Sequence, residues 1–379
     1  MIRSLLTRLA PFPVRTPQSA RPGNGKAPVG AGPGRGRRAR LRDWAELLRV
    51  SALFTVPGDA LAGAAAAGLR PGRGTAYAVG ASLCLYEAGM ALNDWADRDE
   101  DAVDRPHRPV PSGRISPTAA LGAAGLLTAV GLTFAARAGR PALAVASALA
   151  ATVWAYDLRL KHTAAAPAAM AAARALDLLL GATATMSAPN ATPSRRRVVG
   201  TTPSARRELP GGSVDSSGEP QSLMSCQGRD DGQGLGGRHS APPGAARRTA
   251  ASALALAAHT YAVTAVSRHE AHGGSTLTPL AALGATTTLG LLLTRTRATA
   301  GHIPALTAAA YVRTAAIPCL HAALNPSPPL TQRAVGGGIR AMIPLQAALA
   351  ARSGANVTAL AVLGLVPVAR TLARKVSLT

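Results

Sequence analysis

The chain has 379 residues, of which 47% are hydrophobic and only 3% aromatic, and its formal net charge is +23. The arginines cluster in the N-terminal tail, in a central polar stretch and in short loops, without a basic stripe interleaved with aromatic residues, so nucleic-acid binding is not expected. The three cysteines are too few and too scattered for a disulfide framework.

Apolar stretches of bilayer-spanning length recur along the chain and predict an all-α fold, a polytopic transmembrane bundle of about nine helices. The dominant residues of these stretches are alanine and glycine, which let helix backbones approach closely within lipid. Spans are predicted at residues 47–69, 75–95, 117–138, 140–157, 164–186, 249–267, 276–294, 302–323 and, as an interrupted one, 337–369.

Composition divides the chain into four segments. Residues 1–42 read as a disordered basic tail, and residues 188–248, rich in Ser, Pro, Gly and Arg, read as a disordered polar insertion. Residues 43–187 and 249–379 are the expected halves of the membrane bundle. The arginine-bearing loops after the second, fourth and sixth spans share one face, which the positive-inside rule makes cytoplasmic in a cell-membrane protein.

The densest chemical pattern is the run NDWADRDEDAVDRPHRPVPSGR, which begins at Asn93 where an apolar segment ends. If the helix continues into this run, Asn93, Asp94, Asp97 and Asp101 gather on one side of it. Carboxylate oxygens in one pocket suit Mg²⁺ together with substrate phosphates. Neighbouring arginines match phosphate geometry, so the run predicts metal-bridged diphosphate binding; a solvated loop of ion pairs is the alternative.

With NDxxDxxxD followed by Arg108, Pro109, Ser112 and Gly113, the chain resembles the UbiA family of intramembrane prenyltransferases. The resemblance implies a prenyl diphosphate donor, a lipophilic or aromatic acceptor and catalytic Asp94, Asp97, Asp101 and Lys161. It also implies Mg²⁺ held by these aspartates, and substrate contacts by Asn93, Arg105, Arg108 and Tyr156. Lys161 reads equally well as a topology-setting cation at a helix end.

The segment Ser267–Gly274 stands where the family has its second aspartate-rich motif, and it keeps one carboxylate, Glu270. This form, together with residues 325–352, resembles the EboC-like branch of the family. Glu270 is then a further Mg²⁺ ligand and Arg268 a substrate contact. Within the fifth span, Arg174 and Asp177 stand three residues apart and are expected to form a structural pair.

Two rival hypotheses remain at this point. A membrane transporter or binding protein would use the acidic loop to capture cations and would release no pyrophosphate. A catalytically inactive homologue would result if the insertion and the weakened second motif had removed the chemistry. The lipid bilayer is the expected partner in every case.

Overall fold

The computed structural model describes residues 33–49, 53, 55–187, 244–270, 274–295 and 302–367. Two compact units make up the chain, residues 1–42 and Asp43–Thr379, and the second contains the bundle. Within the described residues the fold is all-α, with one π-turn, η2, and no strand. The elements are α1 Pro33–Leu47, α2 Val56–Ala66, α3 Arg73–Ala96, α4 Arg98–Asp104, α5 Pro117–Ala138, α6 Arg140–Ala155, η2 Tyr156–Leu160, α7 Ala166–Ser187, α8 Ala245–Ser267, α9 Leu277–Thr294, α10 Ile303–Leu324, α11 Pro328–Arg352 and α12 Asn356–Leu363.

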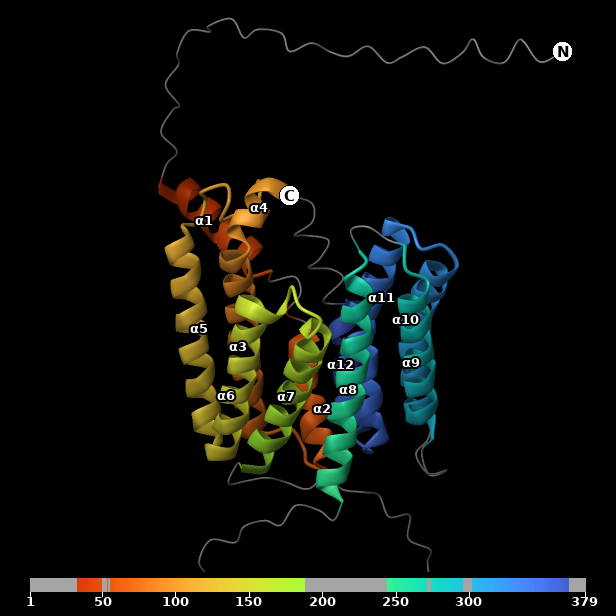
Figure 1. Cartoon of the computed structure of the whole chain (residues 1–379). Coiled ribbons are helices and arrows are strands. Elements are labelled where there is room, and N and C mark those ends of the chain that lie inside the picture. The colour runs from red at the N-terminus through yellow and green to blue at the C-terminus, as the bar shows by residue number, and fades with distance from the viewer. Residues whose placement is uncertain are drawn as a thin grey trace, which may run out of the picture. The chain divides into compact units, whose positions relative to one another are not determined.

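Within the Asp43–Thr379 unit, the long helices run side by side (Figure 1). Seven helices of the described part are long and apolar enough to cross a membrane, namely α6 with η2, and α5, α7, α8, α9, α10 and α11. The predicted all-α transmembrane bundle is confirmed. Helix α3 is long enough to span, but polar residues such as Glu87 and Asp94 make it less apolar.

Two predicted spans differ from the helices observed. Residues 47–69 were expected to form one span, but α2 covers only Val56–Ala66. The final span was expected at residues 337–369, whereas α11 begins at Pro328 and ends at Arg352, and Gly354 then turns the chain with φ +84° before α12. A left-handed glycine breaks a helix in this way because it lacks the Cβ that penalises positive φ.

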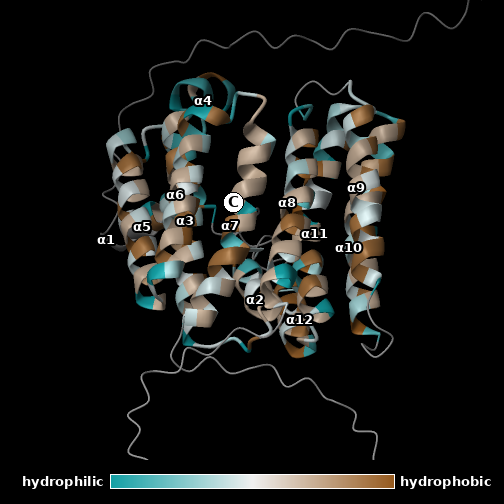
Figure 2. Cartoon of the chain, turned by 60° about the horizontal axis from the view of Figure 1, so that its bottom comes forward, coloured by the Kyte–Doolittle hydropathy of each residue, from teal (hydrophilic) through white to brown (hydrophobic). Residues whose placement is uncertain are grey.

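Outward faces of the bundle are apolar, as expected for helices that meet lipid. The Leu126, Leu254 and Leu291 side chains are exposed on α5, α8 and α9, and Figure 2 shows hydrophobic residues along these helices and hydrophilic ones at α4. Helix α11 is instead buried along most of its length and lies inside the bundle. Soluble proteins place mainly polar side chains on the outer faces of their helices, whereas these faces are apolar, as a bilayer environment requires.

The predicted tail and insertion fall mainly outside the described residues. Residues 33–42 are the exception, because they form the first part of helix α1 instead of a structureless tail. At the other boundary, α8 begins at Ala245, four residues before the expected start of the second half. Residues 1–32 and 188–243 lie outside the described ranges.

Candidate active site

The acidic motif lies where α3 passes into α4 at one end of the bundle (Figure 1). Helical hydrogen bonding continues through the junction, because the Asp97 N–H donates to the Asn93 carbonyl at 2.9 Å and the Asp101 N–H donates to the Asp97 carbonyl at 2.8 Å. With 3.6 residues per turn, Asn93, Asp97, Asp101 and Asp94 follow one another across an arc of about 100°. The four side chains therefore share one broad face.

At one edge of this arc, Asp94 and Asp101 are buried and share a guanidinium. Arg108 Nη1 lies 2.6 Å from Asp101 Oδ2 and 3.5 Å from Asp94 Oδ1. Arg49 adds a contact of 3.3 Å to Asp94, and Arg105 one of 3.5 Å to Asp101. Three arginines thus compensate two carboxylates that water hardly reaches.

The loop that carries Arg105 and Arg108 is attached to the last turns of α1. Arg114 Nη1 contacts Asp43 Oδ1 at 2.6 Å and Glu46 Oε2 at 2.7 Å, and its Nη2 donates to the His107 carbonyl at 2.6 Å. The hydrogen bond to Glu46 raises the pKa of Arg114. Gly113, at φ +74°, provides the tight turn that returns the chain to α5.

At the other edge of the arc, Asn93 and Asp97 face the segment after α6. The Asn93 Nδ2 group donates to Asp157 Oδ1 at 3.2 Å, and Lys161 Nζ forms an ion pair with Asp97. The π-turn η2 lets the Lys161 N–H donate to the Tyr156 carbonyl, five residues earlier, at 3.0 Å. This local widening of the helix is a feature found often at functional sites.

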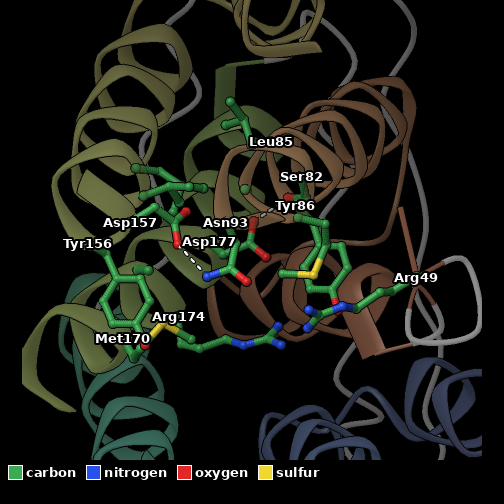
Figure 3. Close-up of a pocket in the computed structure, with 15 residues that line it drawn as sticks. Arg49, Ser82, Leu85, Tyr86, Asn93, Tyr156, Asp157, Met170, Arg174 and Asp177 are labelled. Atoms are coloured by element: carbon green, nitrogen blue, oxygen red, sulfur yellow. Dashed lines mark hydrogen bonds between the residues drawn. The ribbon is translucent and has the colours of Figure 1, made fainter. Parts of the chain in front are cut away.

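A cavity of about 280 Å³ lies beneath the motif, among α3, α6, η2 and α7. Figure 3 shows the guanidinium groups of Arg49 and Arg174 pointing into it beside the hydrogen-bonded Asn93 and Asp157. Apolar side chains, among them Leu85 and Val153, complete the wall. A second cavity of about 280 Å³, lined by α7, α8 and α11, shares three lining residues with the first: Tyr156, Met170 and Arg174.

The expected pairing of Arg174 with Asp177 is corrected by the structure. Arg174 forms its ion pair with Asp59 of α2, and Asp177 accepts a hydrogen bond from Ser82 of α3. Gln346 of α11 also donates to Asp59, at 2.8 Å. Residues three apart on a helix are neighbours, but buried partners on other helices satisfy these charges instead, which fixes α2, α3, α7 and α11 to one another.

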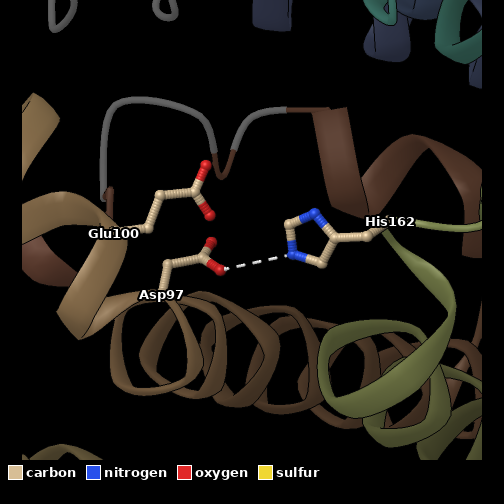
Figure 4. A group of neighbouring side chains, drawn as sticks. All are labelled: Asp97, Glu100 and His162. Carbon is tan, nitrogen blue, oxygen red and sulfur yellow. Dashed lines mark ion pairs between the residues drawn. The ribbon is translucent and has the colours of Figure 1, made fainter.

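The second motif approaches the first only in part. Glu270 lies near enough to Arg105 for that guanidinium to lower the pKa of its carboxyl, although burial raises this pKa by more. Arg268 is exposed at the end of α8. The group of described side chains that brings metal-ligating atoms together is Asp97, Glu100 and His162 (Figure 4), and neither Glu270 nor the other motif aspartates belong to it.

Four residues of this site were not among the predicted site residues. Glu100 and His162 directly adjoin predicted residues, and Asp157 follows Tyr156, so proximity to the motifs was the available signal. Arg49 carried no local pattern. Its backbone has φ +48°, rare for a residue with a side chain, and strain of this kind is found most often at functional sites.

Comparison with known proteins identifies the first half of the bundle. Residues 51–194, which include the acidic motif, η2 and every residue that lines the first cavity except Arg49, match the model of the UbiA prenyltransferase family. The match covers less than half of the chain, and over these residues it supports the resemblance deduced from the sequence.

Curated UbiA relatives match over short stretches. Digeranylgeranylglyceryl phosphate synthase of Methanopyrus kandleri is 39% identical over 128 residues, which is 32% of this chain and 45% of the relative. The enzyme of the same name from Natronomonas pharaonis is 42% identical over 83 residues, or 22% of this chain and 30% of the relative. The chain thus spans less than half the length of these relatives.

Solved UbiA structures share the fold over a longer range. The structure of a UbiA homolog from Archaeoglobus fulgidus bound to GPP and Mg²⁺ has a TM-score of 0.50 at 16% identity, covering 81% of this chain and 99% of that one. The apo structure of a homolog from Aeropyrum pernix K1 gives 0.50 at 13% identity over 78% and 96%. The protein is an integral membrane protein with this helical fold.

Proposed function

We propose that this protein is an intramembrane prenyltransferase, which transfers a prenyl group from a prenyl diphosphate to a lipophilic or aromatic acceptor and releases pyrophosphate. The observation that carries the proposal is the position of Asn93 and Asp97 opposite Asp157 and Lys161, at one end of a cavity within a membrane bundle. The UbiA match of residues 51–194 and the GPP and Mg²⁺ bound by the Archaeoglobus homolog support this reaction class.

The motif carboxylates fit a hard divalent cation, because they offer oxygen ligands along one helix face. Asp94, Asp97 and Asp101 would hold it, with Glu270 approaching from the other half. When bound, Mg²⁺ supplies positive charge against the leaving diphosphate. The aspartates themselves fix where the diphosphate lies, since they extend from consecutive turns across the α3–α4 junction, where backbone hydrogen bonds continue.

Basic side chains around the motif bind the diphosphate oxygens directly. Lys161 directly follows η2 and faces Asp97, and Arg105 and Arg108 lie on the loop after α4. Arg268 follows α8, whose end lies at the same end of the bundle as α4 (Figure 1). Cations held in place before the reaction stabilise the charge that develops as the carbon–oxygen bond breaks.

The cavity walls orient the apolar part of the donor and exclude water. Leu85, Met90 and Val153 line the first cavity beside the polar end at Asn93. Tyr156 borders both cavities, so the donor carbon and the acceptor meet beside it. Exclusion of water there protects the allylic cation from hydrolysis.

We also assign the chain to the EboC-like branch, on Ser267–Gly274 and residues 325–352, and place it in the cell membrane with the motif on the cytoplasmic side. The ends of α3, α6 and α8 carry the loops with arginine or lysine, and the positive-inside rule retains such loops in the cytoplasm.

Pyrophosphate release from a prenyl diphosphate tests the proposal, measured on the purified protein in membranes with Mg²⁺ or with a chelator. We expect the chelator to abolish release and Asp97→Asn to lower it by about 100-fold or more, as the loss of one pre-organised charge does. Asp99→Asn is the matched control, since Asp99 is exposed and pairs only with Arg98 among the contacts described. Equal release by all three proteins, or release that ignores the chelator, would refute prenyl transfer.

A further inference from the structure

Helix α10 lies at the edge of the bundle beside α9 (Figure 1) and carries an arginine at its midpoint. Arg313 is ten residues from Ile303 and eleven from Leu324, so about 15 Å of helix separates it from either end. Its side chain is exposed and has no hydrogen-bond or ion-pair partner among the described contacts. An arginine side chain is too short to carry its charge over that distance to a membrane surface. The guanidinium group is therefore left in the apolar zone without a counter-charge.

Large aliphatic side chains run along the same side of α10. Together with Arg313 they form a row, here called the outer seam: Leu306, Ala310, Arg313, Ile317, Leu320 and Leu324. Successive positions alternate between four and three residues apart, which is the repeat by which two helices pack along a seam. The leucines and the isoleucine are 42–76% exposed, whereas Tyr311 and Ala315 on the opposite side of α10 are buried in the core. The outer seam thus has no partner among the described residues.

The charge of Arg313 decides which occupant fits the outer seam. Lipid chains would cover the leucines but leave the guanidinium without an acceptor, and charges inside a membrane normally pair with an opposite charge. A helix fits the repeat of the seam, and one polar residue within such a seam selects the partner and its register. Charge complementarity therefore requires a helix with a carboxylate at the level of Arg313.

A second copy of this chain does not meet that requirement. Among the described residues, the exposed carboxylates lie on α1 and α4, and they are Glu46, Asp99, Glu100 and Asp104. Helix α4 lies at one end of the bundle, away from the midpoint of α10 (Figure 1). Two copies packed seam against seam would also bring two Arg313 side chains together, and like charges repel.

We propose that the outer seam of α10 docks a transmembrane helix of another membrane protein, which carries an aspartate or glutamate at its midpoint to pair with Arg313. No described residue of α10 lines either of the two cavities. Docking at the outer seam is therefore independent of the proposed prenyl transfer and does not obstruct the cavities.

Energy transfer between the labelled full chain and synthetic helices in phosphatidylcholine vesicles tests the docking. Each synthetic helix matches α10 in length, with 22 leucine and alanine residues between terminal lysines, and has glutamate, leucine or lysine at its midpoint. We expect the glutamate helix to bind about tenfold more tightly than the leucine helix, the usual size of a polar contact between membrane helices. The lysine helix should bind no better than the leucine helix.

Changes of charge at position 313 test the ion pair itself. Arg313→Leu should bind the glutamate and leucine helices alike, because it removes the counter-charge and keeps the seam apolar. Arg313→Glu should instead prefer the lysine helix, a reversal that loss of folding cannot produce. Arg137→Leu is the matched control, since it replaces an exposed arginine in the last turn of α5, and it should keep the preference for glutamate.

A change of size within the outer seam locates the contact on α10. Ile317→Trp should weaken binding of the glutamate and leucine helices alike, because the larger side chain stands in the seam one turn from Arg313. Leu126→Trp is the control, since Leu126 is exposed on α5, and it should bind both helices like the unmodified protein.

Equal binding of the glutamate and leucine helices by the unmodified protein would overturn the proposal, as would a preference for glutamate that survives Arg313→Leu. Normal binding by Ile317→Trp would place the contact elsewhere and overturn it too. Association of two labelled copies that Arg313→Leu abolishes, and that the glutamate helix does not displace, would show that a second copy covers the seam instead.

Discussion

Individual arginines offset the repulsion between the carboxylates of the acidic motif. Asp94 of α3 and Asp101 of α4 lie seven positions apart on one side of the α3–α4 junction and are 3% and 2% exposed. Arg108 contacts both, while Arg49 and Arg105 each contact one. Removal of one partner from a buried ion pair is far more costly than the pair's net contribution, because it leaves an uncompensated charge.

Arg49 and Arg105 remain beside the two carboxylates when Arg108 is replaced, so Arg108→Gln is expected to destabilise the protein by about 1–3 kcal/mol at neutral pH, the usual loss for charged hydrogen bonds. Thermal unfolding in detergent at neutral pH measures this. Arg98→Gln is the control, because Arg98 pairs with the exposed Asp99. A deficit equal to that of the control would contradict the shared role of Arg108.

At the scale of elements, the close approach of α2 and α7 depends on two glycines. A Cβ on Gly181 would lie 2.3 Å from the Ala60 Cα, and one on Gly63 would lie 2.1 Å from the Leu178 carbonyl oxygen. Both contacts are with backbone, which cannot rotate away. This packing also brings Asp59 within reach of Arg174, so the buried ion pair depends on it.

Gly181→Ala should lower stability by about 1–3 kcal/mol, the usual effect of overpacking, and should separate Asp59 from Arg174. Gly125→Ala on α5 is the matched control, since its Cβ would meet nothing within 4 Å. Thermal unfolding of both variants in the same detergent checks the prediction. A Gly181→Ala protein as stable as the control would show that the helices can separate without loss.

Capping residues at helix ends explain which helices could be predicted well from the sequence. The span at residues 117–138 coincides with α5, because Ser116 caps its start with Pro117 in the first turn and Gly139 follows its end. The same start signal, Ser327 before Pro328, lies ahead of the predicted span at residues 337–369, and α11 begins nine residues earlier than predicted. The helix offsets of the motif were also predictable from local spacing. The partners Arg49, Asp59 and Gln346 were not, because they come from distant helices.

For the molecule as a whole, the two cavities share lining residues although they lie mostly in different halves of the bundle. The first cavity lies within residues 49–177, whereas the second is lined largely by α8 and α11, and Tyr156, Met170 and Arg174 border both. Helices α7 and α8 flank the long connection between the halves and contribute to the wall of the second cavity. The halves are therefore held together by side-chain packing.

Replacement of residues 188–243 by about fifteen Gly and Ser residues, roughly 20 Å of flexible chain, should leave unfolding temperature and pyrophosphate release unchanged. Size-exclusion chromatography, thermal unfolding and the release assay test this. Extension of the deletion to residue 256 is the control, because it removes buried Leu256 and the first half of α8, and it should abolish folding. Equal failure of the two deletions would indicate that the connection itself contributes to the fold.

The guanidinium groups beside Asp94 and Asp101 balance the charge of these carboxylates from within the chain. The loop after α4 should therefore keep its conformation when no divalent cation is bound. Exhaustive dialysis against a chelator should thus yield a dormant but intact protein, which regains full turnover within the mixing time once the metal is returned.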